Sequence, residues 1–143
     1  MKRDPLATPP AFVWPVRVYY EDTDSGGVVY YANYLKFLER ARTEWLRAAG
    51  FEQPELLRDH NVIFVVRSVA IEYLRPAQFN DELTVTVRLE KLGGSAMDVF
   101  QTVERDARLV EAHVKIVCVE NTGFKPTGIP APIRQQLESL SRA

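Results

Sequence analysis

The sequence predicts an α+β fold in which a curved antiparallel sheet wraps around one long helix. Residues 31–49 form a single long stretch of helical periodicity, and several stretches of strand periodicity follow it. The strands expected at 82–92, about 97–105 and 109–119 are joined by tight turns, which favours antiparallel pairing because parallel strands need long crossovers. One face of this sheet must be buried, and the helix at 31–49 is the only long helix available to cover it.

The elements follow one another in a simple order along the first half of the chain. A proline-rich stretch at 1–11 predicts a loosely docked tail, and Val, Tyr and Trp predict a first strand at 13–20. An acidic loop at 21–29 leads into the helix, which ends at Gly50, where a left-handed C-terminal cap is expected. The helix carries an apolar stripe at helical spacing: Tyr34, Phe37, Leu38, Ala41, Trp45 and Ala48.

The second half reads as a strand meander. A continuous apolar run opens the strand expected at 62–74, and clean alternation of apolar and polar residues marks the strand at 82–92. Ile133, Leu137 and Leu140 predict a short terminal helix after a connector rich in proline and glycine. We therefore expect a tail at 1–11, one domain at 12–128, and a connector with a short helix at 129–143.

Composition excludes several classes of function. The formal net charge is −1, so bulk electrostatics give no case for binding nucleic acid or an anionic membrane. The one cysteine, Cys118, rules out an internal disulfide and fits a reducing compartment. No apolar run approaches the ~20 residues of a membrane span. We expect a soluble, cytoplasmic protein with no transmembrane segment.

The most informative segment is the acidic loop before the long helix. Glu21, Asp22 and Asp24 crowd into four positions, and Gly26 and Gly27 follow just ahead of the helix. Unpaired backbone N–H groups at a helix start attract negative charge, and glycines let such groups approach a bound carbonyl closely. A carboxylate beside them can attack or deprotonate while they hold a developing oxyanion. This combination predicts acyl-transfer chemistry.

Two other interpretations of this loop were weighed. A solvated turn is the usual explanation for any single acidic loop residue. A calcium loop fails because its fifth position would be Gly26 and its twelfth Asn33, where a bidentate Glu is required. The familiar nucleophiles are also missing: there is no Gly-x-Ser-x-Gly elbow, and Cys118 lies on the apolar side of a strand. His60 and His113 lie far apart, and no Cys/His spacing indicates zinc.

A run of motifs resembles one known family. The motifs are Val16–Asp24, Gly26–Tyr30, Asn33-Tyr34, Glu39–Arg42, Phe64–Arg67, Glu72-Tyr73, Pro76-Ala77 and Asp81. Together they resemble the YbgC-type acyl-CoA thioesterases of the 4-hydroxybenzoyl-CoA thioesterase group, which have the hotdog fold. The likeness covers about residues 14–128. It implies hydrolysis of acyl-CoA thioesters with no metal or organic cofactor.

The resemblance also implies roles for particular residues. It places the catalytic carboxylate on Asp24, the carbonyl-polarising backbone N–H on Tyr31, and a site-lining ring on Tyr20. We expect the substrate to be bound beside them by Gly26, Gly27, Val28 and Asn33. Many family members have a histidine where this chain has Tyr31, so mechanisms that need only the backbone N–H at that position are favoured. Whether Asp24 acts as nucleophile or general base stays open.

Two other functions compete with thioester hydrolysis. One is a non-catalytic module that binds acyl-CoA or an acyl carrier protein, and the other is a hotdog dehydratase, which would need a histidine paired with an acid. Acyl-CoA is the expected partner, with acyl carrier protein as a second way of presenting the acyl group. The apolar strand faces exceed what one helix can cover, so a homodimer or homotetramer is expected.

Overall fold

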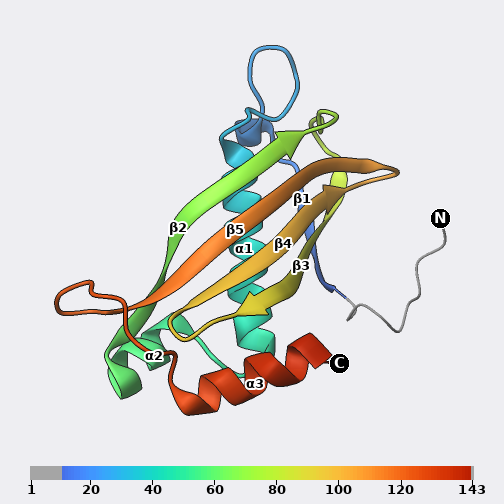
Figure 1. The fold of residues 1–143 in the computed structure, drawn as a ribbon. Coiled ribbons are helices and arrows are strands. Elements are labelled where there is room, and N and C mark those ends of the chain that lie inside the picture. Colours follow the sequence, from blue (N-terminus) through green and yellow to red (C-terminus); the bar gives the residue numbers. More distant parts are fainter. Residues whose placement is uncertain (1–10, 143) are drawn as a thin grey trace.

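The computed structural model describes residues 11–142, and within this range the chain forms one sheet and its covering helices (Figure 1). The strands are β1 (Phe12–Arg17), β2 (Val62–Tyr73), β3 (Glu82–Leu92), β4 (Ala96–Glu104) and β5 (Arg108–Glu120). The helices are α1 (Asn33–Ala48), α2 (Gln53–His60) and α3 (Ala131–Arg142), with a short 3₁₀ turn, η1, at Tyr20–Asp22. Apart from Ala11, the tail expected at 1–11 lies outside the described residues.

The sheet confirms the predicted meander. Its order is β1-β3-β4-β5-β2, and every neighbouring pair is antiparallel. β3, β4 and β5 are consecutive hairpin strands, as their short turns indicated. β1 and β2 close the two edges, and β2 reaches its place beside β5 only after the chain has passed through α1 and α2.

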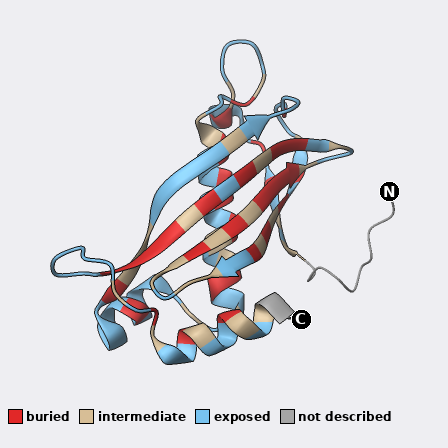
Figure 2. Ribbon diagram, in the orientation of Figure 1, coloured by how far each residue is buried: buried red, intermediate tan, exposed pale blue. Residues whose placement is uncertain are grey.

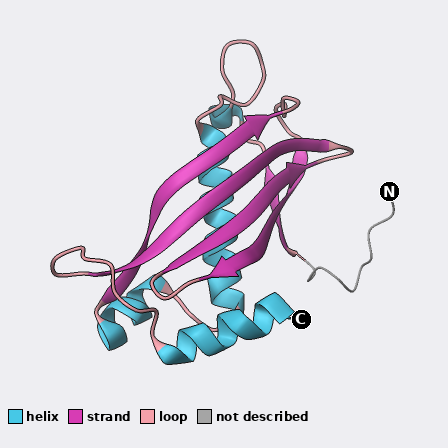
Figure 3. Cartoon of the chain, in the orientation of Figure 1, coloured by secondary structure: helices cyan, strands magenta, loops and turns pink. Residues whose placement is uncertain are grey.

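α1 lies across one face of the sheet, which confirms the predicted α+β fold (Figure 3). Phe37, Leu38 and Ala41 on this helix are fully buried, as the helical spacing predicts. They pack in one apolar core with the inward residues of β3, among them Leu83 and Val85. Ala48, the last position of the predicted stripe, is exposed at the end of the helix. Gly50 adopts a φ of +96°, the left-handed cap expected after this helix.

The structure departs from the predicted elements in two places. β1 ends at Arg17 rather than at residue 20, because Val18 pairs with the turn at Asn80 and Asp81 instead of with a strand. α2 was not predicted at all. It has only eight residues, and Leu56 is the only one of them that is buried, so it offers almost no apolar period to detect.

α3 confirms the predicted terminal helix and adds to the core. Ile133 and Leu137 are fully buried, and the helix lies across the end of the sheet (Figure 1). The Arg134 guanidinium donates to the carbonyls of Gly93 and Gly94 in the β3–β4 turn. These contacts fix α3 at the end of the molecule opposite the acidic loop. Within residues 11–142, no helix combines the length and apolar character needed to cross a membrane.

β2 is an edge strand, and most of its residues are exposed (Figure 2). It has twelve residues, and from Val66 to Ala70 all five are exposed. Val66 is 44% exposed and Val69 38% exposed. A long apolar edge with unpaired backbone groups invites pairing with another strand.

Candidate active site

The acidic loop folds into a small hairpin that projects beyond the end of the sheet (Figure 1). Three successive pairs hold it together: Tyr30 N–H donates to the Asp22 carbonyl at 3.0 Å, Thr23 bridges Val29, and Asp24 N–H donates to the Val28 carbonyl at 2.9 Å. Gly27 closes the turn at a φ of +82°, a conformation that favours glycine. Asp24 therefore lies next to the hairpin tip.

The Asp24 carboxylate is exposed, and its own loop orients it. Its Oδ1 accepts a hydrogen bond from Gly26 N–H at 2.8 Å, which is an Asx turn. Its Oδ2 makes no hydrogen bond to any other residue in the range 11–142. A Cβ on Gly26 would lie 3.3 Å from Oδ1, so glycine keeps the carboxylate in this position. One oxygen is thus held while the other is available to a ligand.

The first turn of α1 follows directly after this hairpin. The first turn is of 3₁₀ type: Asn33 donates to Tyr30, Tyr34 to Tyr31 and Leu35 to Ala32. The helix begins at Asn33, two residues later than the predicted start at Tyr31, yet this first turn already includes the Tyr31 carbonyl. Among the described residues, the N–H of Tyr31 has no hydrogen-bond acceptor. Such a group attracts a developing negative charge.

The hairpin ladder relates these two features in space. The Asp22–Tyr30 pair lies at the base of the hairpin, and Asp24 lies two residues further toward its tip. At about 3.3 Å per residue, this places Asp24 about 7 Å from Asp22 along the strand. Tyr31 follows Tyr30 directly. The carboxylate and the N–H group therefore belong to the same end of the molecule (Figure 1).

The remaining predicted site residues have different environments. Tyr20 lies in η1 and is 79% exposed, with its ring edge-on to Phe79 at 5.7 Å. Val28 is half-buried and forms a bridge with Gln78. Asn33 is the first residue of α1, where its side-chain amide donates to the Asp22 carbonyl at 2.9 Å. That bond ties the helix start to the hairpin base, so the structure gives Asn33 an anchoring contact.

Asp22 differs from Asp24 in that its side chain is buried, at 7% exposure, and used within the fold. Its Oδ2 accepts from Tyr19 N–H at 2.8 Å. Its carbonyl accepts from Tyr30 N–H and from the Asn33 side chain. In the range 11–142, no group of three or more His, Cys, Asp or Glu residues could hold a metal ion. Asp22 is therefore a structural residue, whereas Asp24 has a carboxylate oxygen that is available to a ligand.

Tyrosines surround the start of α1, and burial raises the pKa of two of them. Burial raises the pKa of Tyr34 above its ordinary value of 10.0, and the nearby Tyr73 acts in the same direction. Burial also raises the pKa of Tyr73. The Tyr73 hydroxyl donates to the Tyr31 carbonyl at 3.3 Å. These rings can position the helix start, but they cannot serve as bases.

Other candidate nucleophiles and bases lie away from this end. Cys118 is fully buried, and burial raises the pKa of its thiol to about 11, so the thiol is protonated and inert. His113 is exposed on the sheet, 3.4 Å from a Glu90 carboxylate oxygen and against the Phe100 ring. The buried position of Cys118 agrees with its predicted place on the apolar side of a strand.

A groove runs along α1 beside the bare edge of β2. One part is a cavity of about 420 Å³ and the next is a cavity of about 260 Å³, and both are bounded by Glu39, Arg42 and Val66. Leu35 lies in the second part, four residues and about 6 Å of helix rise from Tyr31. Asp24 lies outside both cavities.

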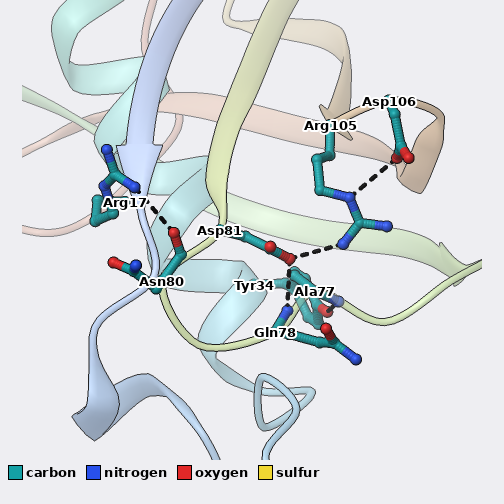
Figure 4. A network of polar contacts seen from close by, with 8 residues as sticks. All are labelled: Arg17, Tyr34, Ala77, Gln78, Asn80, Asp81, Arg105 and Asp106. Carbon is teal, nitrogen blue, oxygen red and sulfur yellow. Dashed lines mark hydrogen bonds and ion pairs between the residues drawn. The ribbon is translucent and has the colours of Figure 1, made fainter.

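Sequence reasoning missed a group of residues that supports the hairpin. Tyr34 on α1, Ala77 and Asp81 form hydrogen bonds behind it (Figure 4). The sequence placed Tyr34 in the apolar stripe of the helix and gave Ala77 and Asp81 no role. Tyr34 and Ala77 are 43 residues apart, so only the folded structure reveals their hydrogen bond.

Known proteins similar to this chain share its fold and most of its length. Residues 18–137 match the thioesterase-like superfamily. The chain is 42% identical to "Acyl-CoA thioesterase YbgC" of Haemophilus influenzae over 130 residues, which is 90% of this chain and 96% of the relative. It is 44% identical to "Acyl-CoA thioester hydrolase YbgC" of Escherichia coli O6:H1 over 124 residues, which is 85% of this chain and 92% of the relative.

Among solved structures, a probable thioesterase from Bartonella henselae superposes with a TM-score of 0.81 at 37% identity. That match covers 85% of this chain and all of the other. These findings confirm both the resemblance to YbgC-type proteins and the hotdog architecture of sheet and central helix. By motif, length and fold, this chain belongs to the thioesterase-like superfamily.

Proposed function

We propose that this protein is an acyl-CoA thioesterase that hydrolyses a thioester to a free carboxylic acid and CoA. The proposal rests on two groups at the same end of the molecule. One is the second carboxylate oxygen of Asp24, and the other is the Tyr31 N–H; neither has a hydrogen-bond partner among residues 11–142. The names of the YbgC relatives, acyl-CoA thioesterase and acyl-CoA thioester hydrolase, support the same chemistry. A thioester is already activated, so this small set of groups suffices.

In the proposed mechanism the Tyr31 N–H holds the thioester oxygen as negative charge develops on it. One such donor is worth about 3–4 kcal/mol, and a positioned base contributes about 10²–10⁴-fold. Asp24 either attacks the carbonyl carbon or removes a proton from an attacking water. Gly26, Gly27 and Val28 line the approach, and Tyr20 covers it from η1. The groove beside α1 receives the acyl chain.

Replacing Asp24 with Asn tests the proposal directly. We expect Asp24→Asn to fold normally and to lose at least about 100-fold in kcat, measured as free thiol released from a panel of acyl-CoAs. Glu21→Gln is the matched control, because Glu21 is an exposed acid three residues away and should be dispensable. Near-parental activity in Asp24→Asn would show that another group does the chemistry. A parental enzyme that cleaves no acyl-CoA or acyl carrier protein thioester would favour the non-catalytic binding module.

The two roles of Asp24 differ in a measurable way. Attack by Asp24 forms a mixed anhydride and releases CoA before hydrolysis, so a stoichiometric burst of thiol is expected when the second step is slower. A single turnover in oxygen-18 water that labels Asp24 identifies the anhydride route. An unlabelled enzyme together with no thiol burst favours the general base.

We further propose that the active form is a homo-oligomer built by pairing the β2 edges of two copies. The exposed Val66 and Val69 support this, because they lie along an uncovered apolar edge beside the groove. A second copy would cover this groove and enclose the site, which is open in one chain. Two such dimers would form the tetramer.

Charge placed on the β2 edge tests the assembly. Val66→Glu combined with Val69→Glu should give the mass of a single chain by light scattering and lower the activity, whereas the parental protein should have at least twice that mass. Thr84→Glu is the control, since Thr84 is exposed on the interior strand β3. A parental protein with the mass of one chain would contradict the assembly while leaving the role of Asp24 intact.

A further inference from the structure

Two successive backbone N–H groups in the turn between β2 and β3 are held by side chains (Figure 4). Ala77 N–H donates to the Tyr34 hydroxyl at 3.0 Å, and Gln78 N–H donates to the Asp81 carboxylate at 2.8 Å. Ala77 and Tyr34 are buried, at 0% and 3% exposure. The same Asp81 oxygen accepts from the Arg105 guanidinium at 2.7 Å. Two acceptors therefore fix this turn, the Tyr34 hydroxyl from α1 and the Asp81 carboxylate from the turn itself, and the Arg105 guanidinium donates to the same carboxylate.

The same turn forms the outer support of the acidic hairpin. Val29 N–H donates to the Ala77 carbonyl at 2.9 Å, and Val28 bridges Gln78. Val28 in turn accepts from Asp24 N–H. A displacement of Ala77 and Gln78 would move Val28 and Val29, and with them the Asp24 carboxylate.

Tyr34 connects the two halves of the proposed site. It lies in the first turn of α1, where its N–H donates to the Tyr31 carbonyl, so it moves with the helix start. Its hydroxyl reaches the turn that supports Asp24. A single side chain thus links the segment that presents the Tyr31 N–H to the segment that presents the carboxylate.

We propose that Tyr34 and Asp81 are positioning residues for catalysis, which act through the turn at 77–81 to hold Asp24 in register with the start of α1. The inference rests on the proposed function of Asp24. Neither side chain has a contact with the Asp24 carboxylate, so neither is a catalytic residue. Their effect is on alignment, and misplacement of a reacting group by about 1 Å can cost about 10²-fold in rate.

The turn has a second anchor that keeps the fold intact when the first is removed. Val18 N–H donates to the Asp81 carbonyl at 2.9 Å, and Asn80 N–H donates to the Val18 carbonyl at 3.0 Å. Arg17 also donates to the Asn80 carbonyl. These bonds tie the end of the turn to β1. Loss of the Tyr34 hydroxyl therefore frees Ala77, beside the hairpin, while Asn80 and Asp81 stay bonded to Val18.

The decisive variants change one acceptor at a time. Tyr34→Phe should lower kcat about tenfold to a hundredfold and change KM by less than about threefold, because alignment fails while the binding surfaces remain. Amide hydrogen exchange in residues 22–31 should become faster in the same variant. Asp81→Ala should lower kcat about tenfold, whereas Asp81→Asn, which keeps an acceptor for Gln78 N–H, should restore most of it. Ile133→Val, a core change at the far end, controls for lost stability.

Several results would overturn the inference. Tyr34→Phe and Asp81→Ala with kcat within twofold of the parent would do so, and if Asp24→Asn is inactive in the same assay the proposed function still stands. An equal loss in Asp81→Asn and Asp81→Ala would show that charge, not the acceptor, matters. An equal loss in Ile133→Val would show a general stability effect. Full activity in Asp24→Asn would overturn both proposals together.

Discussion

Gln101 offers the sharpest test of how the core is built, because its amide is fully buried between the sheet and α1. The side-chain oxygen accepts from the Arg42 guanidinium at 2.9 Å, and the amide nitrogen donates to the carbonyls of Leu38 at 3.1 Å and Thr86 at 3.3 Å. Arg42 is half-buried, and burial lowers the pKa of its guanidinium, whereas the nearby Glu39 acts in the opposite direction. Gln101→Leu keeps the volume and removes all three bonds.

The expected loss follows from these three bonds. A hydrogen bond to a charged group contributes about 1.5–3 kcal/mol and a neutral one about 0.5–1.5 kcal/mol. The apolar gain of leucine offsets about 1–2 kcal/mol of that loss. We therefore expect Gln101→Leu to lower the free energy of unfolding by about 2–4 kcal/mol, mostly because the Arg42 charge is left without its acceptor.

The assay is urea unfolding followed by circular dichroism, at one fixed protein concentration because self-association would add to the apparent stability. Arg42→Met and the double variant Arg42→Met/Gln101→Leu complete a cycle. The double variant should cost less than the two single changes added together, since removing both partners leaves no buried charge. A cost below about 0.5 kcal/mol for Gln101→Leu, or strict additivity in the cycle, would refute this reasoning.

Two further predictions concern glycine and cysteine. Gly27→Ala should lower the free energy of unfolding by about 1–2 kcal/mol, because a φ of +82° strains any side chain. Gly26→Ala should change the free energy of unfolding in urea by less than about 0.5 kcal/mol. It should nonetheless reduce thiol release, because the added Cβ would lie 3.3 Å from the Asp24 carboxylate. Equal losses of stability in the two glycine variants would contradict this. The pKa of the Cys118 thiol rises from 9.0 to about 11 on folding, so its contribution to stability is complete below pH 9 and is lost as the pH rises to about 11. Cys118→Ala should remove up to about 3 kcal/mol of the fall in unfolding free energy between pH 9 and pH 11. If the unfolding free energies of the two proteins follow parallel curves against pH, the prediction is wrong.

Local sequence patterns predicted most of the fold. The 3.6-residue period of α1 and the alternation in β3 are properties of neighbouring residues, so they can be recognised without the rest of the chain. Gly50 was predicted as a left-handed cap by its position alone, and its φ agrees. α2 was missed because Leu56 is its single buried residue and gives no period.

The candidate site was predicted in part. The acidic loop and the two glycines indicated a carboxylate near a helix start, and the resemblance singled out Asp24. The sequence did not separate the available Asp24 from the structural Asp22, because that difference depends on which carboxylate Tyr19 N–H reaches. The structure gives the Asn33 side-chain amide a contact with the Asp22 carbonyl, and its role in substrate binding stays a prediction.

The sequence by itself determined α1, α3, the antiparallel meander of β3, β4 and β5, and the family, because these depend on short-range periodicity and on contiguous motifs. Tertiary structure alone decided which residues meet. Tyr34 and Ala77 are 43 residues apart, and Gln101 and Leu38 are 63 apart. Such pairs produce no periodic pattern in the sequence, because the packing of the helix against the sheet decides which residues meet. The same packing placed β2 at an edge of the sheet, beside β5.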